Sequence, residues 1–137
     1  MSTEKRKNLK MTIFRFREFP VYQDARAFRK LWKQRSKAKL SREEDHVLRP
    51  QLWRALDSVV LNIAEGTERY TDKDFSHFLN IALGSVNECV ACFDCMLDDG
   101  YIGQGELDEG LHDAENLIRQ LKGFAASLRK RTKQGVI

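Results

Sequence analysis

The sequence has few of the residues that break helices or cross-link small proteins. Its 137 residues include two prolines, Pro20 and Pro50, and both stand where a helix could begin. The three cysteines are closely spaced and odd in number, which argues against a secreted disulfide framework. No run of about 18 apolar residues is evident, and the basic residues 1–10 lack the apolar core of a secretory signal. These absences predict one cytoplasmic domain of long helices, with no membrane segment.

Charge is distributed unevenly along the chain, although the formal net charge is only +4. Residues 1–40 carry 13 Lys/Arg against 3 Asp/Glu, and residues 117–137 carry 6 against none. Residues 71–116 carry a single cation against 11 acids. Two basic ends that flank an acidic middle are a reason to consider nucleic acid as a partner, although such charges often only solvate helix faces.

Apolar residues recur at helical spacing in four segments, of which Val21, Ala25, Phe28 and Trp32 form the first. The predicted helices run from near Pro20 to the polar connection 37–45, from Pro50 to Gly66, from Thr71 to Asp98, and from Glu106 to Lys133. Their ends carry suitable signals: proline in a first turn, Gly66 as a C-terminal cap, Asp74 as capping partner of Thr71, and cations at the last turn. A further capping box, Ser41 with Glu44, is expected in the connection.

Four amphipathic helices with short connections predict an all-α, antiparallel up-down-up-down four-helix bundle over residues 14–133. Residues 1–13 are expected to be a basic, partly disordered tail, and residues 134–137 a second short tail. Apolar and basic residues alternate over residues 13–19, which suggests an extended lead-in to the first helix.

The antiparallel topology brings both basic ends of the chain to one pole of the bundle. A cluster of this kind binds phosphate backbones without reading sequence, with an affinity that falls as salt rises. The candidate nucleic-acid contacts are Lys5, Arg6, Lys7, Lys10, Arg15, Arg17, Arg26, Arg29, Lys30, Arg129, Lys130, Arg131 and Lys133. The alternative is that these cations only form ion pairs with acidic side chains of the bundle.

The second predicted helix is apolar over more of its girth than one core requires. This width indicates a subunit interface at Trp53, Val60, Leu61 and Ala64. The alternative is that Leu61 is simply exposed, as single apolar residues often are. Polar residues on or near the packing faces of the second and third helices predict a buried hydrogen-bond network, or alternatively a contact with a partner. With Gly66, the residues of this group are Asn62, Glu65, Asn80, Ser85 and Glu88.

The cysteines and histidines of the sequence give little support for a catalytic site. Cys89-x-x-Cys92-x-x-Cys95 resembles cluster-binding spacing but lacks a fourth cysteine, so buried idle thiols are the favoured interpretation. Each histidine follows an acid by three residues: Glu43/His46, Asp74/His77 and Glu109/His112. Because His77 and His112 lie one position off the apolar stripes, we expect no metal, no cofactor and no enzymatic activity. A metal-dependent bundle enzyme remains a distant alternative.

Several segments together resemble the bacterial four-helix-bundle proteins of the 23S rRNA intervening-sequence type. They are Asn62-Ile63-Ala64-Glu65-Gly66, residues 78–85 with Glu88, the opening residues 16–25, and Gly100-Tyr101-Ile102. The resemblance covers roughly residues 14–130. It implies a bundle that assembles into a ring, typically a homopentamer. Related bundles serve as accessory proteins of reverse transcriptases and bind both nucleic acid and the polymerase.

The favoured hypothesis is therefore a non-catalytic, oligomeric scaffold that binds RNA or DNA with low specificity through its basic pole. The alternative is an accessory subunit whose partner is a protein, for example a reverse transcriptase.

Overall fold

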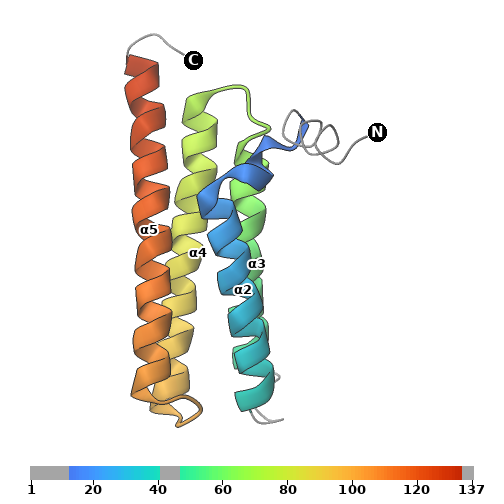
Figure 1. Ribbon diagram of the computed structural model, residues 1–137, viewed down its shortest axis with the longest axis vertical. Helices are drawn as coiled ribbons and strands as arrows, with labels where there is room; N and C mark the ends of the chain where they lie inside the picture. The colour runs from blue at the N-terminus through green and yellow to red at the C-terminus, as the bar shows by residue number, and fades with distance from the viewer. Residues whose placement is uncertain (1–12, 41–46, 134–137) are drawn as a thin grey trace.

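Four long helices run alternately up and down the computed structural model, which describes residues 13–40 and 47–133 (Figure 1). The elements in chain order are a 3-10 turn η1 (Arg15–Glu18) and the helices α2 (Pro20–Lys39), α3 (Leu48–Gly66), α4 (Asp72–Asp98) and α5 (Gln104–Lys133). Helix α4 packs against α3 and α5 over most of its length, and α2 packs against the same two helices. The predicted all-α antiparallel bundle is confirmed.

Local sequence explains most helix ends. Pro20 occupies the first turn of α2, where its fixed φ suits a helix and its missing N–H costs nothing. The Thr71 hydroxyl accepts a hydrogen bond from the Asp74 backbone N–H at 3.1 Å and caps α4, as the sequence predicted. After α4 the chain turns at Gly100, whose φ of 81° lies in the left-handed region that favours glycine.

Four predicted features differ from the structure, and one is the end of the first helix, because α2 continues to Lys39 into the predicted connection 37–45. The lead-in is a 3-10 turn rather than extended, because the ring of Phe16 packs edge-on against Tyr22, with 5.0 Å between centroids. Helix α3 begins at Leu48, so Pro50 lies within its first turn, and α5 begins at Gln104 rather than Glu106. The expected capping box of Ser41 and Glu44 lies outside the described residues.

The core has two aromatic layers. In the half that contains the α4–α5 connection, Trp32 and Phe93 stack with 3.9 Å between ring centroids, and both are fully buried. In the other half, the Phe124 ring lies 5.3 Å from Phe19 at the start of α2 and 5.0 Å from Phe75 in α4. Nine residues of α5 follow Phe124, so this helix continues for roughly 14 Å past the level at which α2 begins.

Helix α4 is notably apolar along its length. By length and composition alone, helix α4 contains a stretch that is long and apolar enough to cross a membrane. The stretch includes Ser85, Asn87 and Glu88 and is not an unbroken apolar run, so the absence of a membrane segment stays a prediction. Packing explains part of the apolarity, because α4 lies against both α3 and α5 and buries Leu79, Val86 and Phe93 in the core.

Candidate nucleic-acid interface

The starts of α2 and α4 and the ends of α3 and α5 meet at one pole, as the topology predicted (Figure 1). Four of the candidate cations, Lys5, Arg6, Lys7 and Lys10, lie outside the described residues. Arg15 and Arg17 are exposed on η1, which contacts α2 and α3 and, within the described residues, not α5. The two basic ends therefore share the pole, but their described parts do not touch.

The end of α5 carries most of the available positive charge. Arg129, Lys130 and Lys133 are exposed and form no ion pair with any described residue. Arg131 differs, because its guanidinium donates two hydrogen bonds to the Asp72 carboxylate, at 3.1 and 2.7 Å. The Asp72 side chain is only 8% exposed. Arg131 therefore ties α5 to the start of α4, and its assignment as a free phosphate contact needs correction.

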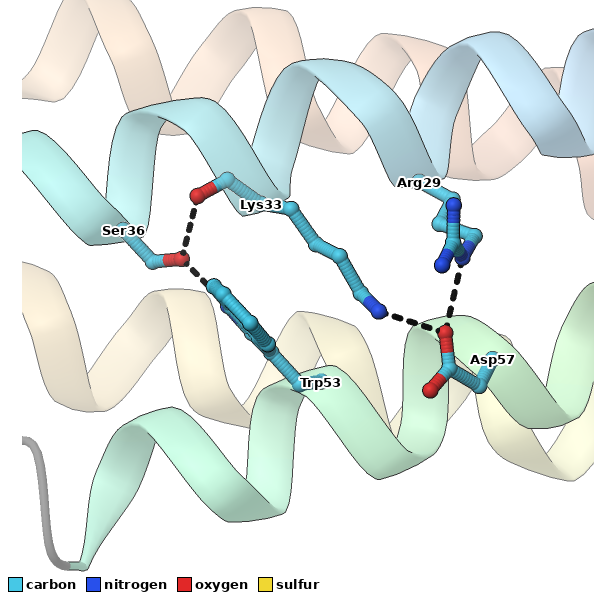
Figure 2. A network of polar contacts seen from close by, with 5 residues as sticks. All are labelled: Arg29, Lys33, Ser36, Trp53 and Asp57. Atoms are coloured by element: carbon cyan, nitrogen blue, oxygen red, sulfur yellow. Dashed lines mark hydrogen bonds and ion pairs between the residues drawn. The ribbon is translucent and has the colours of Figure 1, made fainter.

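The basic stripe of α2 is also partly occupied within the chain. Arg29 Nε and Lys33 Nζ each lie 2.7 Å from Asp57 Oδ1 on α3 (Figure 2). Burial raises the pKa of Asp57, but hydrogen bonds and charge attraction from Lys33 and Arg29 outweigh it and leave the pKa below its ordinary value. Arg29 is thus a structural cation. Arg26 and Lys30 are exposed and form no ion pair within the described residues.

Ser36, in the turn of α2 that follows Lys33, holds the Trp53 side chain of α3 against α2 (Figure 2). The indole Nε1 donates a hydrogen bond to Ser36 Oγ at 2.8 Å, and Ser36 Oγ donates to the Lys33 carbonyl at 3.1 Å. Lys33 Nζ lies 4.8 Å from the centre of the Trp53 ring. Of the predicted oligomer contacts, Trp53 and Val60 are therefore packed within the chain, whereas Leu61 is 64% exposed and Ala64 is half-buried.

The predicted polar network exists, but with fewer members. The hydroxyls of Ser58 and Ser85 lie 2.7 Å apart across α3 and α4, and Asn62 Nδ2 donates to Ser58 Oγ at 3.0 Å and to the Ser58 carbonyl at 2.8 Å. Glu65, Asn80 and Glu88 are exposed, so their assignment to a buried network was wrong. Glu65 pairs instead with Arg69 one turn later.

Gly66 serves packing rather than helix termination. Gly100 alone has a positive φ among the described residues, so Gly66 is not a left-handed cap. A Cβ at Gly66 would lie 2.8 Å from Phe75 Cδ1 and 3.2 Å from Phe78 Cβ. The absence of a side chain lets α3 end close against the start of α4.

A groove of about 480 Å³ lies between the first turns of α4 and the last turns of α5. Its lining includes the predicted cations Arg129 and Lys133, and also Lys73, which the sequence analysis did not select. Nearby in sequence, Tyr70 is 99% exposed. Both residues had a sequence signal: Lys73 is the single cation of residues 71–116, and the connection that holds Tyr70 was predicted at the basic pole.

Thiols and imidazoles do not assemble into a reactive centre in the described part of the chain. Burial raises the pKa of Cys92 to about 11 and that of Cys89 further, so both remain protonated thiols at neutral pH, whereas Cys95 is exposed. His77 and His112 lie on the surface, and His46 lies outside the described residues. Residues 13–40 and 47–133 contain no cluster of three potential metal ligands.

The fold and its surface define a four-helix-bundle protein with a cationic pole. The chain belongs to the family of 23S rRNA-intervening sequence proteins, whose family model matches residues 17–123. A similar solved structure is that of a protein of unknown function from the S23 ribosomal protein family of Bacteroides thetaiotaomicron VPI-5482. It is 20% identical, covers 77% of this chain and 97% of its own, and superposes with a TM-score of 0.67, a likeness that shows the fold alone. The curated proteins gave no significant match.

Proposed function

We propose that the chain is a non-catalytic, oligomeric scaffold of the cytoplasm that binds nucleic acid through its cationic pole. The observation that carries the proposal is the set of three exposed cations at the end of α5, Arg129, Lys130 and Lys133, which have no carboxylate partner among the described residues. A cation without a partner can neutralise a phosphate and release its counterion, whereas a cation in an ion pair must first leave its carboxylate.

An exposed aromatic residue at the same pole adds to this argument. Tyr70 is 99% exposed in the connection between α3 and α4, beside Arg69 and three residues before Lys73. Packing does not account for it, because its ring is open to solvent. Exposed rings next to cations are typical of proteins that bind single strands, where each base stacks on an aromatic side chain. We therefore favour single-stranded nucleic acid, or a structured nucleic acid with unpaired bases.

Self-association would repeat the pole around a symmetry axis and strengthen multivalent binding. Two exposed apolar residues support it, Leu61 of α3, which is 64% exposed, and Ile81 of α4, which is 38% exposed. Because Ser58 faces Ser85 in the antiparallel pair, Leu61 and Ile81 lie at about the same level. We propose this apolar pair, with Ala64, as the subunit contact, and a ring such as the homopentamer that the family resemblance suggests.

The binding test compares two triple variants with the same change in net charge. One is Arg129→Gln/Lys130→Gln/Lys133→Gln, which removes unpaired cations. The other is Arg35→Gln/Lys39→Gln/Arg119→Gln, which removes cations that pair with Glu109, Glu106 and Glu115. Binding to single-stranded RNA across a salt series should lose about two units of salt slope and at least about tenfold in affinity in the first variant only.

Equal weakening in both variants would mean that net charge, rather than this pole, governs binding. Absence of binding to RNA and to duplex DNA at low salt would overturn the nucleic-acid proposal and leave a protein partner, such as a reverse transcriptase, as the alternative. The assembly is tested separately by light scattering. Leu61→Glu should lower the mass of the particle without loss of helicity, and a monomeric wild-type protein would overturn the oligomeric part of the proposal.

A further inference from the structure

The groove between the first turns of α4 and the last turns of α5 differs from the rest of the pole. It is formed by two helices that continue past the start of α2, and its volume of about 480 Å³ falls in the size range of sites for small ligands. Figure 1 shows these two helix ends side by side. The groove is therefore a concave site within the basic pole, rather than a flat patch of charge.

Three cations from both helices line this groove: Lys73 from α4, and Arg129 and Lys133 from α5. All three are exposed, and none has an ion pair within the described part of the chain. The groove also contains one carboxylate, that of Asp72, but Arg131 binds both of its oxygens, at 2.7 and 3.1 Å. Because Arg131 compensates Asp72, the three remaining cations give the groove a net positive charge.

The exposed imidazole of His77 and three neutral side chains, Ser76, Asn80 and Thr132, complete the lining. Ser76 is 9% exposed, and its hydroxyl has no hydrogen-bond partner among the described residues. Asn80 presents an exposed amide from the next turn of α4, whereas the Thr132 hydroxyl donates to the Leu128 carbonyl. The Ser76 hydroxyl and the Asn80 amide can therefore donate hydrogen bonds to an oxygen-rich ligand in the groove.

We propose that this groove binds a phosphomonoester. Such a group carries a charge of about −1.5 to −2 at neutral pH and three strong acceptor oxygens, whereas an internal phosphodiester carries a single charge. Three cations with hydroxyl and amide donors match the monoester in charge and in hydrogen-bonding capacity. The phosphate belongs either to the 5′ end of a nucleic-acid strand, a form that rests on the proposed function, or to a free nucleotide.

The test uses a short single-stranded RNA labelled at its 3′ end, in a 5′-phosphorylated and a 5′-hydroxyl form. We expect the 5′-phosphate to tighten binding about tenfold in the wild-type protein, as judged by fluorescence anisotropy. Arg129→Gln/Lys133→Gln should abolish the preference, and Ser76→Ala should reduce it. Lys130→Gln is the matched control, because it removes a cation of the same helix end that does not line the groove. It should weaken both forms equally and leave the preference intact.

A second arm measures adenosine monophosphate and adenosine by calorimetry. Binding of the monophosphate and not of adenosine, with loss in Arg129→Gln/Lys133→Gln, supports the groove and identifies a free nucleotide as a source. If the monophosphate binds and neither RNA does, the groove stands and the nucleic-acid proposal fails. If the two RNA forms bind equally and the monophosphate does not bind, the groove is overturned while the nucleic-acid proposal stands. A 5′-phosphate preference that survives in Arg129→Gln/Lys133→Gln would also overturn it.

Discussion

The two poles of the bundle use their cations in different ways. At the pole that contains the α4–α5 connection, Arg35 Nη2 lies 2.9 Å from Glu109 and Lys39 Nζ lies 3.8 Å from Glu106, so the basic end of α2 is matched by the acidic start of α5. We call this the matched pole. At the opposite pole, where α5 ends, Arg131 has a carboxylate partner in Asp72, and its neighbours in α5 have none within the described residues. We call this the open pole.

The difference follows from helix length as well as charge. At the matched pole, α2 ends beside the start of α5, so cations of one helix meet acids of the other. At the open pole, α5 continues roughly 14 Å past the ring contact between Phe19 and Phe124, beyond the reach of α2. Charges placed on such an extension have few intramolecular partners. The comparison indicates that intramolecular pairing occupies the matched pole and leaves the open pole for ligands.

The largest expected effect tests how tightly the core is packed in the half of the bundle that contains the matched pole. A Cβ at Gly110 would lie 2.6 Å from Trp32 Cζ2 and 3.2 Å from Phe93, and both rings are fully buried. Gly110→Ala should therefore lower the free energy of unfolding by about 1–3 kcal/mol, measured by chemical denaturation. Gly123→Ala is the control on the same helix, because a Cβ there meets nothing within 4 Å. It should be neutral or stabilise by up to about 1 kcal/mol, and equal effects of the two changes would contradict the packing argument.

The second prediction concerns a variant in which Arg131, the paired cation of the open pole, loses its carboxylate partner. Asp72→Asn removes the charge that holds Arg131, and should cost about 1–2 kcal/mol of stability because the carboxylate is buried and bound twice. Binding to RNA should tighten, and the salt slope should rise by about 1, since Arg131 becomes available to a phosphate. Asp74→Asn makes the same charge change in an exposed neighbour and releases no cation. Equal gains in affinity would show that net charge alone matters.

The sequence predicted the architecture because its signals are local. Pro20, Thr71 and the apolar spacing place the helices within three residues of their observed ends, and antiparallel order then gives the two poles. The sequence did not predict which cations are paired. Asp72 and Arg131 are 59 residues apart, and their contact depends on the relative length and rotation of two helices. Neither the relative length nor the relative rotation follows from the apolar periodicity, so the sequence does not distinguish paired cations from unpaired ones.

The same limit explains the errors in the polar network. An apolar stripe shows which side of a helix faces the core, but it does not decide whether a residue at the edge of the stripe is buried. Successive residues are rotated by about 100° around the helix axis, so a shift of one position changes the answer. Ser85 fell on the buried side of that edge, and Glu88 on the exposed side. The groove was missed for another reason. It is formed by residues that are distant in sequence, and Lys73 belongs to a segment that is otherwise acidic.

The third prediction concerns the paired cations midway between the poles. Lys33 and Arg29 lower the pKa of Asp57 more than burial raises it, so the folded state favours the ionised carboxylate. Its contribution to stability is present above the pKa of the unfolded chain and is lost as the pH falls through the folded pKa. Because Asp57 is 40% exposed, we expect Asp57→Asn to cost no more than about 1 kcal/mol near neutral pH.

The measurement is the difference in unfolding free energy between wild type and Asp57→Asn, from about pH 7 to about pH 3. The difference should shrink toward zero at the acidic end. Asp94→Asn is the control, because Asp94 is exposed and has no ion pair within the described residues. Its difference should stay small throughout. A constant cost of Asp57→Asn across the range would mean that the amide disturbs packing rather than charge.

The smallest effect separates the two glutamates that the sequence placed in a buried network. Both are exposed, so Glu65→Ala and Glu88→Ala should each change stability by less than about 0.5 kcal/mol. Their effects on RNA binding should differ, because Glu65 pairs with Arg69 beside the open pole, whereas Glu88 lies in the middle of α4. Glu65→Ala frees Arg69 and should raise the salt slope of RNA binding by up to about 1, beyond any change in Glu88→Ala. If the two variants bind RNA alike, the pairing of Arg69 with Glu65 does not reduce the number of cations that contact phosphates. The contrast between the poles would then rest on geometry alone.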